Sequence, residues 1–544
     1  MLDSRYFLGA WIAACSCNLL LPEVAWGQVI PDGTTDTIIA PAPGPCATTC
    51  SIVTSGQTNT TTTNVFHSFE QFSIPTEGSV TFEQAPSIRN VLVRVTGENG
   101  STIDGFIRAT SDSNLFLMNP NGILFGPNGG IDIGGSFVAT TAEAIEFSDQ
   151  GQFSTIDTAS DLTLLTIDPS AFLFGQAAPQ AIVSQSTATN LVRPAALGGL
   201  VMRENKSLLL IGGEVTLEVA NPLDPESDPT TVQAPGGRIE LGGLSGPGRV
   251  ELNTNNDSLS LSYEDDALLS DISIRDSRLN VSSRSNSDNS AGDVVIAADT
   301  ISIIGSSIDS NTFGTEEAGN VSIRASNSVE LQESTISSTT IGFGEGGNIE
   351  ITASSLSLDE VSILSVSTNN RGDAGSIFLN AETITLQGRS SLDSAASLTQ
   401  QTSLEATGKP GEIQIQTNSL SLSDGSIIST LTADNAVDSE PSNPLVIEAR
   451  NDISLTTRSS ITSETRGERD ASNIRLNAAS ISLDNSSISA STSSEGDAGS
   501  IFITNAETVT LDGDSELSAR STGQGSAGNL SVQSDEFRVQ DGSR

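Results

Sequence analysis

From Gly292 to its end, the sequence repeats one pattern at a period typical of stacked repeats. Copies such as "AGDVVIAADTISIIGSSIDS", "AGNVSIRASNSVELQESTISS" and "GGNIEITASSLSLDEVSILS" follow one another, and about nine units recur at spacings of 27 to 36 residues. Self-similarity at this period is the signature of a solenoid, in which each unit contacts only its neighbours. The repeat therefore constrains the fold more strongly than composition does.

Each unit contains three short runs in which apolar and polar residues alternate. In the unit that begins at Gly319, these runs are marked by Val321 and Ile323, then Val329 and Leu331, then Ile336. Alternation with a period of two places the apolar side chains on one face of a strand. The pattern predicts an all-β solenoid, a parallel β-helix with three short strands per coil.

The repeats are expected to form a β-helical shaft over residues 291–544. Extra length follows the third run at 395–409 and 431–441, which predicts variable loops at one corner. The chain stops at "FRVQDGSR", where the third strand of a coil is expected. Solenoids generally need a polar cap and none follows, so we expect the sequence to be a fragment of a longer product.

The first 27 residues have the features of a secretory signal peptide. Arg5 supplies a positive n-region, Leu8 to Leu21 an apolar core, and Ala25 to Gly27 a small-residue cleavage site. The segment "IAAC" also looks like a lipoprotein lipobox, but the apolar residues after it fit a continuing signal core better. We predict cleavage before Gln28 and passage through the periplasm.

Two cysteines, Cys46 and Cys50 in "PCATTC", remain after such a cleavage. An oxidising compartment favours a disulfide between them. A zinc site would need two further ligands nearby, and the sequence has none there, so we expect no metal and no cofactor.

The charge of the chain limits its partners. Lys and Arg number 24 against 67 Asp and Glu, for a net charge of -43. Such a surface repels the phosphates of nucleic acids and anionic lipids. No later segment is apolar over a membrane-spanning length, so we expect an exported chain with no stable membrane insertion.

The N-terminal part has a bulkier core, because twelve of the eighteen phenylalanines lie between Phe66 and Phe174. Its segments "NVFHSFEQFSIP", "IRNVLVRVTGENGSTIDGFI" and "NLFLMNPNGILFGPNGGIDIGGSFVATTA" closely resemble the secretion domain of filamentous-haemagglutinin-type exoproteins of two-partner secretion systems. The resemblance implies a right-handed parallel β-helix over about residues 28–290. It also implies export by a dedicated outer-membrane transporter with periplasmic repeats.

The most specific element of the resemblance is "NPNGI", formed by Asn119, Pro120, Asn121, Gly122 and Ile123. The family implies that this turn takes part in transporter recognition. Physically, Pro120 fixes φ and Asn121-Gly122 readily adopts positive φ, so a plain β-helix corner is the alternative. We also expect the turns clustered around this motif to close the first coils and cap the solenoid.

The upstream "NGS" at 99–101 lacks the proline that relatives often carry in their Asn-Pro-Ser turn. At this turn, the contacts known for the family therefore cannot be transferred residue by residue to this chain. The resemblance of the longer segments is not affected.

Catalytic constellations are not evident, and we expect no enzyme. The sole histidine, His67, excludes catalysis by a histidine pair, and the neighbours Asp265 and Asp266 are a poor carboxylate pair for a glycosidase. We predict a secreted, adhesin-like exoprotein, extracellular or at the cell surface, with an unknown surface, host or neighbour-cell ligand. The alternatives are a β-helical polysaccharide lyase or hydrolase, and the N-terminal part of a contact-dependent toxin carrier.

Overall fold

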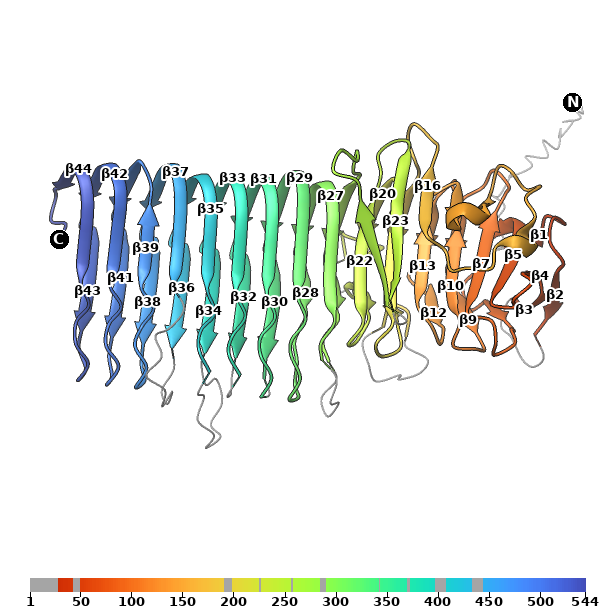
Figure 1. Cartoon of the computed structure of the whole chain (residues 1–544), viewed down its shortest axis with the longest axis horizontal. Helices are drawn as coiled ribbons and strands as arrows, with labels where there is room; N and C mark the ends of the chain where they lie inside the picture. Colours follow the sequence, from red (N-terminus) through yellow and green to blue (C-terminus); the bar gives the residue numbers. More distant parts are fainter. Residues whose placement is uncertain are drawn as a thin grey trace, which may run out of the picture.

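The computed structural model describes residues 28–42, 49–189, 198–224, 227–255, 258–283, 290–341, 343–368, 372–396, 408–432 and 444–544. These residues form β-strands and two short 3-10 helices, η1 (Ser148–Gln150) and η2 (Leu162–Leu164). The strands stack side by side into an elongated solenoid, with β1 (Val29–Pro31) near one end and β44 (Leu530–Val539) at the other (Figure 1). The predicted parallel β-helix is confirmed.

Each coil of the shaft begins with a long strand that pairs in parallel with the long strand of the next coil. Val321 lies beside Ile349, and Ile349 lies beside Ile377. All three side chains are fully buried, so one inward position of the coil becomes an aliphatic row along the axis. The long strands are β27 (Asp293–Ile304), β29 (Val321–Gln332), β31 (Ile349–Asp359), β33 (Ile377–Leu386), β35 (Ile413–Leu422), β37 (Leu445–Thr456), β42 (Ile501–Asp512) and β44.

A short strand completes each coil and forms a second parallel sheet. The strands of this sheet are β18 (Leu200–Val201), β21 (Thr230–Gln233), β26 (Ser277–Asn280), β28 (Ser307–Asp309), β30 (Thr335–Thr340), β32 (Ile363–Thr368), β34 (Ser391–Ala396), β36 (Ile427–Thr432), β38 (Ser460–Thr465), β41 (Ser487–Thr492) and β43 (Glu516–Ser521). The predicted insertions follow β34 and β36, and most of their residues lie outside the described ones.

The first two runs of alternating residues are joined in most shaft coils. The strand β29 contains both predicted runs, and its register against β31 shifts between Arg324 and Ser328, where the strand bends. The small Ala325 is buried at this bend, which lets the chain turn without ending the sheet. In one coil the two runs stay separate, as β39 (Ile474–Asn477) and β40 (Ser480–Asp484).

Glycines at the coil corner are required by the close approach of the backbones. A Cβ atom on Gly347 would lie 2.1 Å from the carbonyl oxygen of Gly319, and one on Gly375 would lie 1.9 Å from that of Gly347. Real Cβ atoms do not approach backbone so closely. The glycine that opens most repeats is thus explained by stacking.

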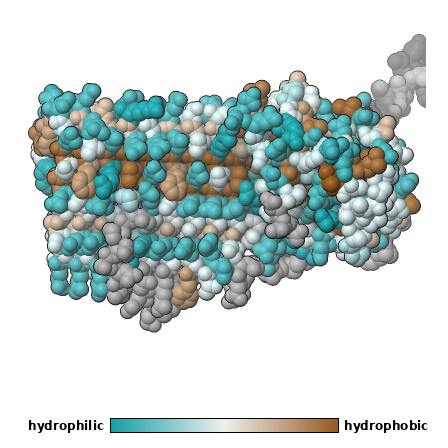
Figure 2. Space-filling model, viewed as in Figure 1, coloured by the Kyte–Doolittle hydropathy of each residue, from teal (hydrophilic) through white to brown (hydrophobic). Residues whose placement is uncertain are grey.

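A row of buried serines holds the next corner of the shaft. The backbone N–H of Ser334 donates to Oγ of Ser362 (3.2 Å), and the N–H of Ser362 donates to Oγ of Ser390 (3.2 Å). Each serine hydroxyl thereby satisfies a buried backbone donor of the preceding coil, which would otherwise lack a partner. On the face of the shaft seen in Figure 2, rows of hydrophilic residues lie on either side of an apolar band that runs along the axis.

The N-terminal coils use shorter strands in the same first sheet. They are β4 (Gln57–Thr58), β5 (Asn64–Phe72), β7 (Asn90–Val95), β8 (Ser101–Ile103), β10 (Asn114–Met118), β11 (Ile123–Phe125), β13 (Phe137–Thr140), β17 (Ala181–Ser184), β19 (Ser207–Gly212), β20 (Glu214–Leu217), β22 (Arg238–Gly243) and β25 (Asp271–Arg275). A separate sheet contains β2 (Thr37–Pro41), β3 (Cys50–Ser55), β6 (Ser79–Phe82), β9 (Phe106–Ala109) and β12 (Gly130–Asp132).

The start of the solenoid is covered by its own N-terminal segment. Strand β1 pairs antiparallel with β5, and β2 pairs antiparallel with β3. The prediction that the clustered turns around NPNGI cap the solenoid is wrong, because β10 lies inside the stack, paired in parallel with both β7 and β13. An antiparallel N-terminal segment satisfies the first edge where no preceding coil exists.

A second apolar core, which the sequence analysis did not predict, lies outside the β-helix. Its antiparallel sheet is formed by β14 (Ala144–Glu146), β15 (Gln152–Ser154), β16 (Ala171–Phe174), β23 (Gly248–Asn255) and β24 (Ser258–Tyr263). The Phe66 ring contacts those of Phe147 and Phe153 at centroid distances of 5.9 and 5.1 Å. This sheet covers the outward face of the first coils, so β7 is buried on both faces.

Arg94 connects the first coils to this outer sheet. Its side chain is fully buried, Nε donates to Oγ of Ser68 (2.8 Å), and Nη1 donates to the carbonyl of Ser154 (2.6 Å). The guanidinium also lies 4.6 Å from the centroid of the Phe153 ring. Burial lowers the pKa of Arg94 to about 10, and the charge of Asp32 opposes that effect. The residue therefore stays charged near neutral pH and ties three segments together.

His67 is part of the first core, in keeping with a structural role. Nδ1 lies 3.1 Å from Oγ1 of Thr37, and Nε2 lies 3.0 Å from the side-chain nitrogen of Gln84. Because the amide nitrogen of Gln84 can only donate, Nε2 accepts and Nδ1 carries the proton. Burial lowers the pKa of His67 to about 3, so the ring is neutral at physiological pH.

Replacing Gly347 with alanine should destabilise the shaft by about 1–3 kcal/mol, the usual cost of overpacking. The added Cβ would meet the Gly319 carbonyl and push two coils apart. Urea unfolding followed by circular dichroism measures the effect. The matched change Gly246→Ala should be nearly neutral, because only one atom lies near that Cβ, at 3.9 Å. Equal midpoints for both variants would contradict the stacking account.

Acid should destabilise the N-terminal end through His67. The folded pKa of about 3 lies below the ordinary value of 6.5, so the unfolded chain binds the proton first and stability is lost as pH falls from 6.5 towards 3. Between pH 6.5 and 5 the loss is roughly 2 kcal/mol. Urea unfolding across this range should show a shallower pH dependence for His67→Gln than for wild type. Asn128→Ala, which changes an exposed side chain bonded to Asp104, should keep the wild-type slope. Equal slopes for His67→Gln and wild type would refute this assignment.

Candidate functional site

Asn119 to Gly122 of the NPNGI motif form the turn between β10 and β11, and Ile123 begins β11. Asn119 and Pro120 are buried, whereas Asn121 is exposed to solvent. The motif therefore divides into an inner part that holds the turn and an outer part that a partner can contact.

Asn119 holds two neighbouring coils together at this corner. Its Nδ2 donates to the carbonyl of Asn99 (3.0 Å) and to Oγ of Ser101 (3.0 Å). Its Oδ1 accepts from the backbone N–H of Asn121 (3.0 Å). The buried amide of Asn119 is thus satisfied on both its nitrogen and its oxygen, and the NGS turn at 99–101 contacts the NPNGI turn directly.

The outer residues of the motif are also positioned by the preceding turn. Nδ2 of Asn121 donates to the carbonyl of Gly97 (2.8 Å), and the N–H of Gly122 donates to the carbonyl of Asn119 (3.2 Å). Gly122 adopts a φ of +101°, while Asn121 keeps a negative φ. Positive φ is therefore found at the glycine alone, where no Cβ opposes it.

A cavity of about 840 Å³ lies beside the turn. It is lined by parts of the motif, Asn121 to Ile123, and by residues of the adjoining coils that include Ile74, Pro75 and Val183. Of the lining outside the motif, sequence reasoning singled out only the NGS turn at 99–101, because the other lining residues are far apart in the chain. The cavity combines an apolar wall with the exposed amide of Asn121.

The predicted disulfide is only partly within the described residues. Cys50 is disulfide-bonded, at the start of β3. Cys46 lies outside the described residues, so the pairing of Cys46 with Cys50 stays a prediction. The predicted signal peptide, residues 1–27, also lies outside them.

The carboxylates considered for catalysis lie in a turn rather than in a strand. Asp265 and Asp266 follow β24, are exposed, and line a cavity of about 450 Å³ together with Asp299. Among the described residues, no group of three or more His, Cys, Asp or Glu side chains is arranged to hold a metal ion. In the same part of the chain, no helix has the length and apolar character needed to cross a membrane.

Comparison with known proteins identifies the N-terminal half. The family described as the TPS secretion domain matches residues 27–296. The chain belongs to the two-partner-secretion exoproteins. Such secretion domains mark proteins that a partner transporter exports through the periplasm to the cell surface or the extracellular space.

Two solved secretion domains are similar to this exoprotein. The crystal structure of the HMW1 secretion domain from Haemophilus influenzae shares 14% identity, with a TM-score of 0.47, over 94% of this chain and 99% of that one. The crystal structure of the filamentous hemagglutinin secretion domain shares 13% identity, with a TM-score of 0.28, over 66% of this chain and 97% of that one. No curated protein matches the chain.

Truncating Asn119 to alanine should destabilise the secretion domain by about 1–3 kcal/mol, because buried polar partners lose their hydrogen bonds. Differential scanning calorimetry of the purified protein measures this loss. The matched variant Asn128→Ala removes an exposed asparagine from the next turn, whose side-chain amide donates to the carboxylate of Asp104. A melting temperature for Asn119→Ala equal to that of Asn128→Ala would contradict a structural role for Asn119.

Proposed function

We propose that this exoprotein is an adhesin-like protein. We also propose that its NPNGI turn is recognised by an outer-membrane transporter with periplasmic repeats. The family match over residues 27–296 supports export by a partner transporter. The observation that carries the site assignment is the exposure of Asn121 at the edge of the 840 Å³ cavity, above a turn that the buried Asn119 holds rigid.

The NPNGI turn is suited to early recognition because all the residues that contact it precede the shaft. The side chains of Asn119 and Asn121 bond back to the turn at 97–101. The later contacts, from Gln176 to the carbonyl of Pro120 and between Ile182 and Ile123, also lie before the shaft begins at residue 291. The turn can therefore form before the long shaft has been delivered, since closing a short loop costs little entropy. An extended segment of the entering chain would pair with a strand edge of the periplasmic repeats, while the turn fixes the register.

The shaft provides the surface for binding outside the cell. Its coils present rows of polar side chains at the ordinary interstrand spacing of ~4.8 Å over a long, stiff body. Folding of these coils after exit would make export one-way, because a folded β-helix cannot return through the transporter. The ligand of this surface is a component of another cell or of a host.

Export measured with the cognate transporter tests this proposal. With the transporter present, Asn121→Ala should reduce the amount of protein in the medium about tenfold or more, because the exposed amide is a recognition contact. Asn128→Ala, in the neighbouring turn, should be exported like wild type. The amount of each variant in the periplasm and its melting temperature serve as controls for expression and folding.

Release of the wild-type chain without the transporter would contradict the two-partner route. Normal release of Asn121→Ala with the transporter would leave the route intact and reject the NPNGI turn as the recognition site.

A further inference from the structure

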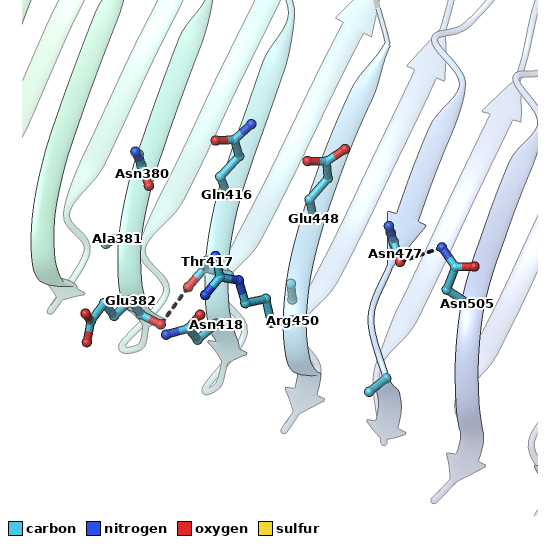
Figure 3. Close-up of a pocket in the computed structure, with 12 residues that line it drawn as sticks. Asn380, Ala381, Glu382, Gln416, Thr417, Asn418, Glu448, Arg450, Asn477 and Asn505 are labelled. Carbon is cyan, nitrogen blue, oxygen red and sulfur yellow. Dashed lines mark hydrogen bonds between the residues drawn. The ribbon is translucent and has the colours of Figure 1, made fainter.

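A hollow with polar walls runs along the shaft where the long strands bend. Its volume is about 670 Å³, and it crosses β33, β35, β37, β39 and β42 (Figure 3). The hollow lies in the shaft, well beyond residues 27–296, which match the secretion-domain family.

The hollow is built from three rows that run along the axis. Its floor is formed by Ala381, Thr417 and Ala449, which are buried and lie side by side in successive strands. Small side chains at the bend thus leave the space open. One wall follows the row of Asn380, Gln416, Glu448 and Asn477. The other wall contains Glu382, Asn418 and Arg450.

The walls present hydrogen-bonding groups to the solvent. Figure 3 shows Gln416 and Glu448 on one side of the bend and Asn418 and Arg450 on the other. These four side chains make no side-chain hydrogen bond or ion pair within the described residues. Two side-chain hydrogen bonds join other lining residues. Oγ1 of Thr417 donates to the carbonyl of Glu382 (3.1 Å), and at the end of the hollow Nδ2 of Asn505 donates to Oδ1 of Asn477 (3.2 Å).

The geometry of the hollow restricts what can bind there. The strands β33, β35 and β37 are paired on both sides, so their backbone groups cannot add a further peptide strand. The rows repeat every ~4.8 Å along the axis, which places the outermost wall residues roughly 19 Å apart. A linear polymer laid along the axis would meet a polar side chain at each step, a carboxamide at most of them and the carboxylate of Glu448 at one.

The charge and hydrogen-bonding groups of the walls further restrict the class of ligand that can bind. Carboxamides both donate and accept hydrogen bonds, as do sugar hydroxyls. The net charge of -43 repels polyanions, and a single arginine, Arg450, stands against Glu382 and Glu448 in the hollow. We propose that this hollow is a binding groove for a neutral, linear glycan. The assignment stands on the groove alone and does not depend on the route of export.

Native gel electrophoresis of the purified full-length chain, in gels containing glucomannan, xyloglucan or dextran, tests the proposal. The wild-type chain should be retarded by at least one of these neutral polysaccharides. The double variant Gln416→Ala/Arg450→Ala should weaken the association about tenfold, the effect of losing about 1.4 kcal/mol of hydrogen bonding. The matched control Gln332→Ala/Arg520→Ala, placed outside the groove, should bind like wild type. Equal melting temperatures show that all variants are folded.

Three results would overturn the glycan assignment. The first is the absence of retardation in every neutral gel, and the second is equal retardation of wild type and the groove variant. The third is preferential binding of polylysine that Glu448→Gln abolishes, which would identify the groove as a site for basic peptides. Because purified protein is used, none of these outcomes bears on recognition by the transporter.

Discussion

The close contact between backbones of successive coils is the constraint on which the rest of the structure depends. At the glycine corner the carbonyl of one coil occupies the place where the next coil would carry a Cβ, as between Gly319 and Gly347. Once this spacing is fixed, parallel pairing places identical positions of every coil above one another. Aliphatic rows, serine rows and outer polar rows then follow from one repeated sequence, and the polar rows at the bend of the long strands create the groove.

The N-terminal half needs additional strands that cover its first coil, because no preceding coil pairs with the first edge of a solenoid. The antiparallel β1–β3 segment covers that edge, and the outer antiparallel sheet adds a second core rich in phenylalanine. The buried Arg94 joins both to the coils through Ser68 and Ser154. A secretion domain stabilised in this way can hold a small exposed turn rigid, which is what a recognition site at Asn121 requires.

The repeats could be predicted from the sequence because their information is local. The inward residues Val321, Ile323, Val329, Leu331 and Ile336 alternate within a few residues, and all five are buried in β29 and β30. The sequence analysis did not predict that the first two runs of a coil join into one strand. A small residue at the bend does not indicate whether the strand pairing continues through it. In the shaft, the same positions of every coil stack on one another, so a local pattern of apolar residues is enough to predict which side chains are buried.

The outer sheet could not be predicted, because its strands are short and pair across long sequence distances, as Phe172 does with Val250. The motif NPNGI was recognisable, but its division into a buried Asn119 and an exposed Asn121 depends on the preceding turn at 97–101. The groove in the shaft likewise arises from residues 380–505, which no single repeat contains.

The register of the coils is the central claim, and disulfide trapping tests it most directly. Glu350 and Phe378 are outward neighbours in paired strands, whereas Asn380 is displaced from Glu350 by two positions. Oxidation of Glu350→Cys/Phe378→Cys, followed by mass spectrometry, should give the intramolecular disulfide readily. Glu350→Cys/Asn380→Cys should react far more slowly under the same conditions. Preferential trapping of the second pair would contradict the register and the β-helical stack built on it.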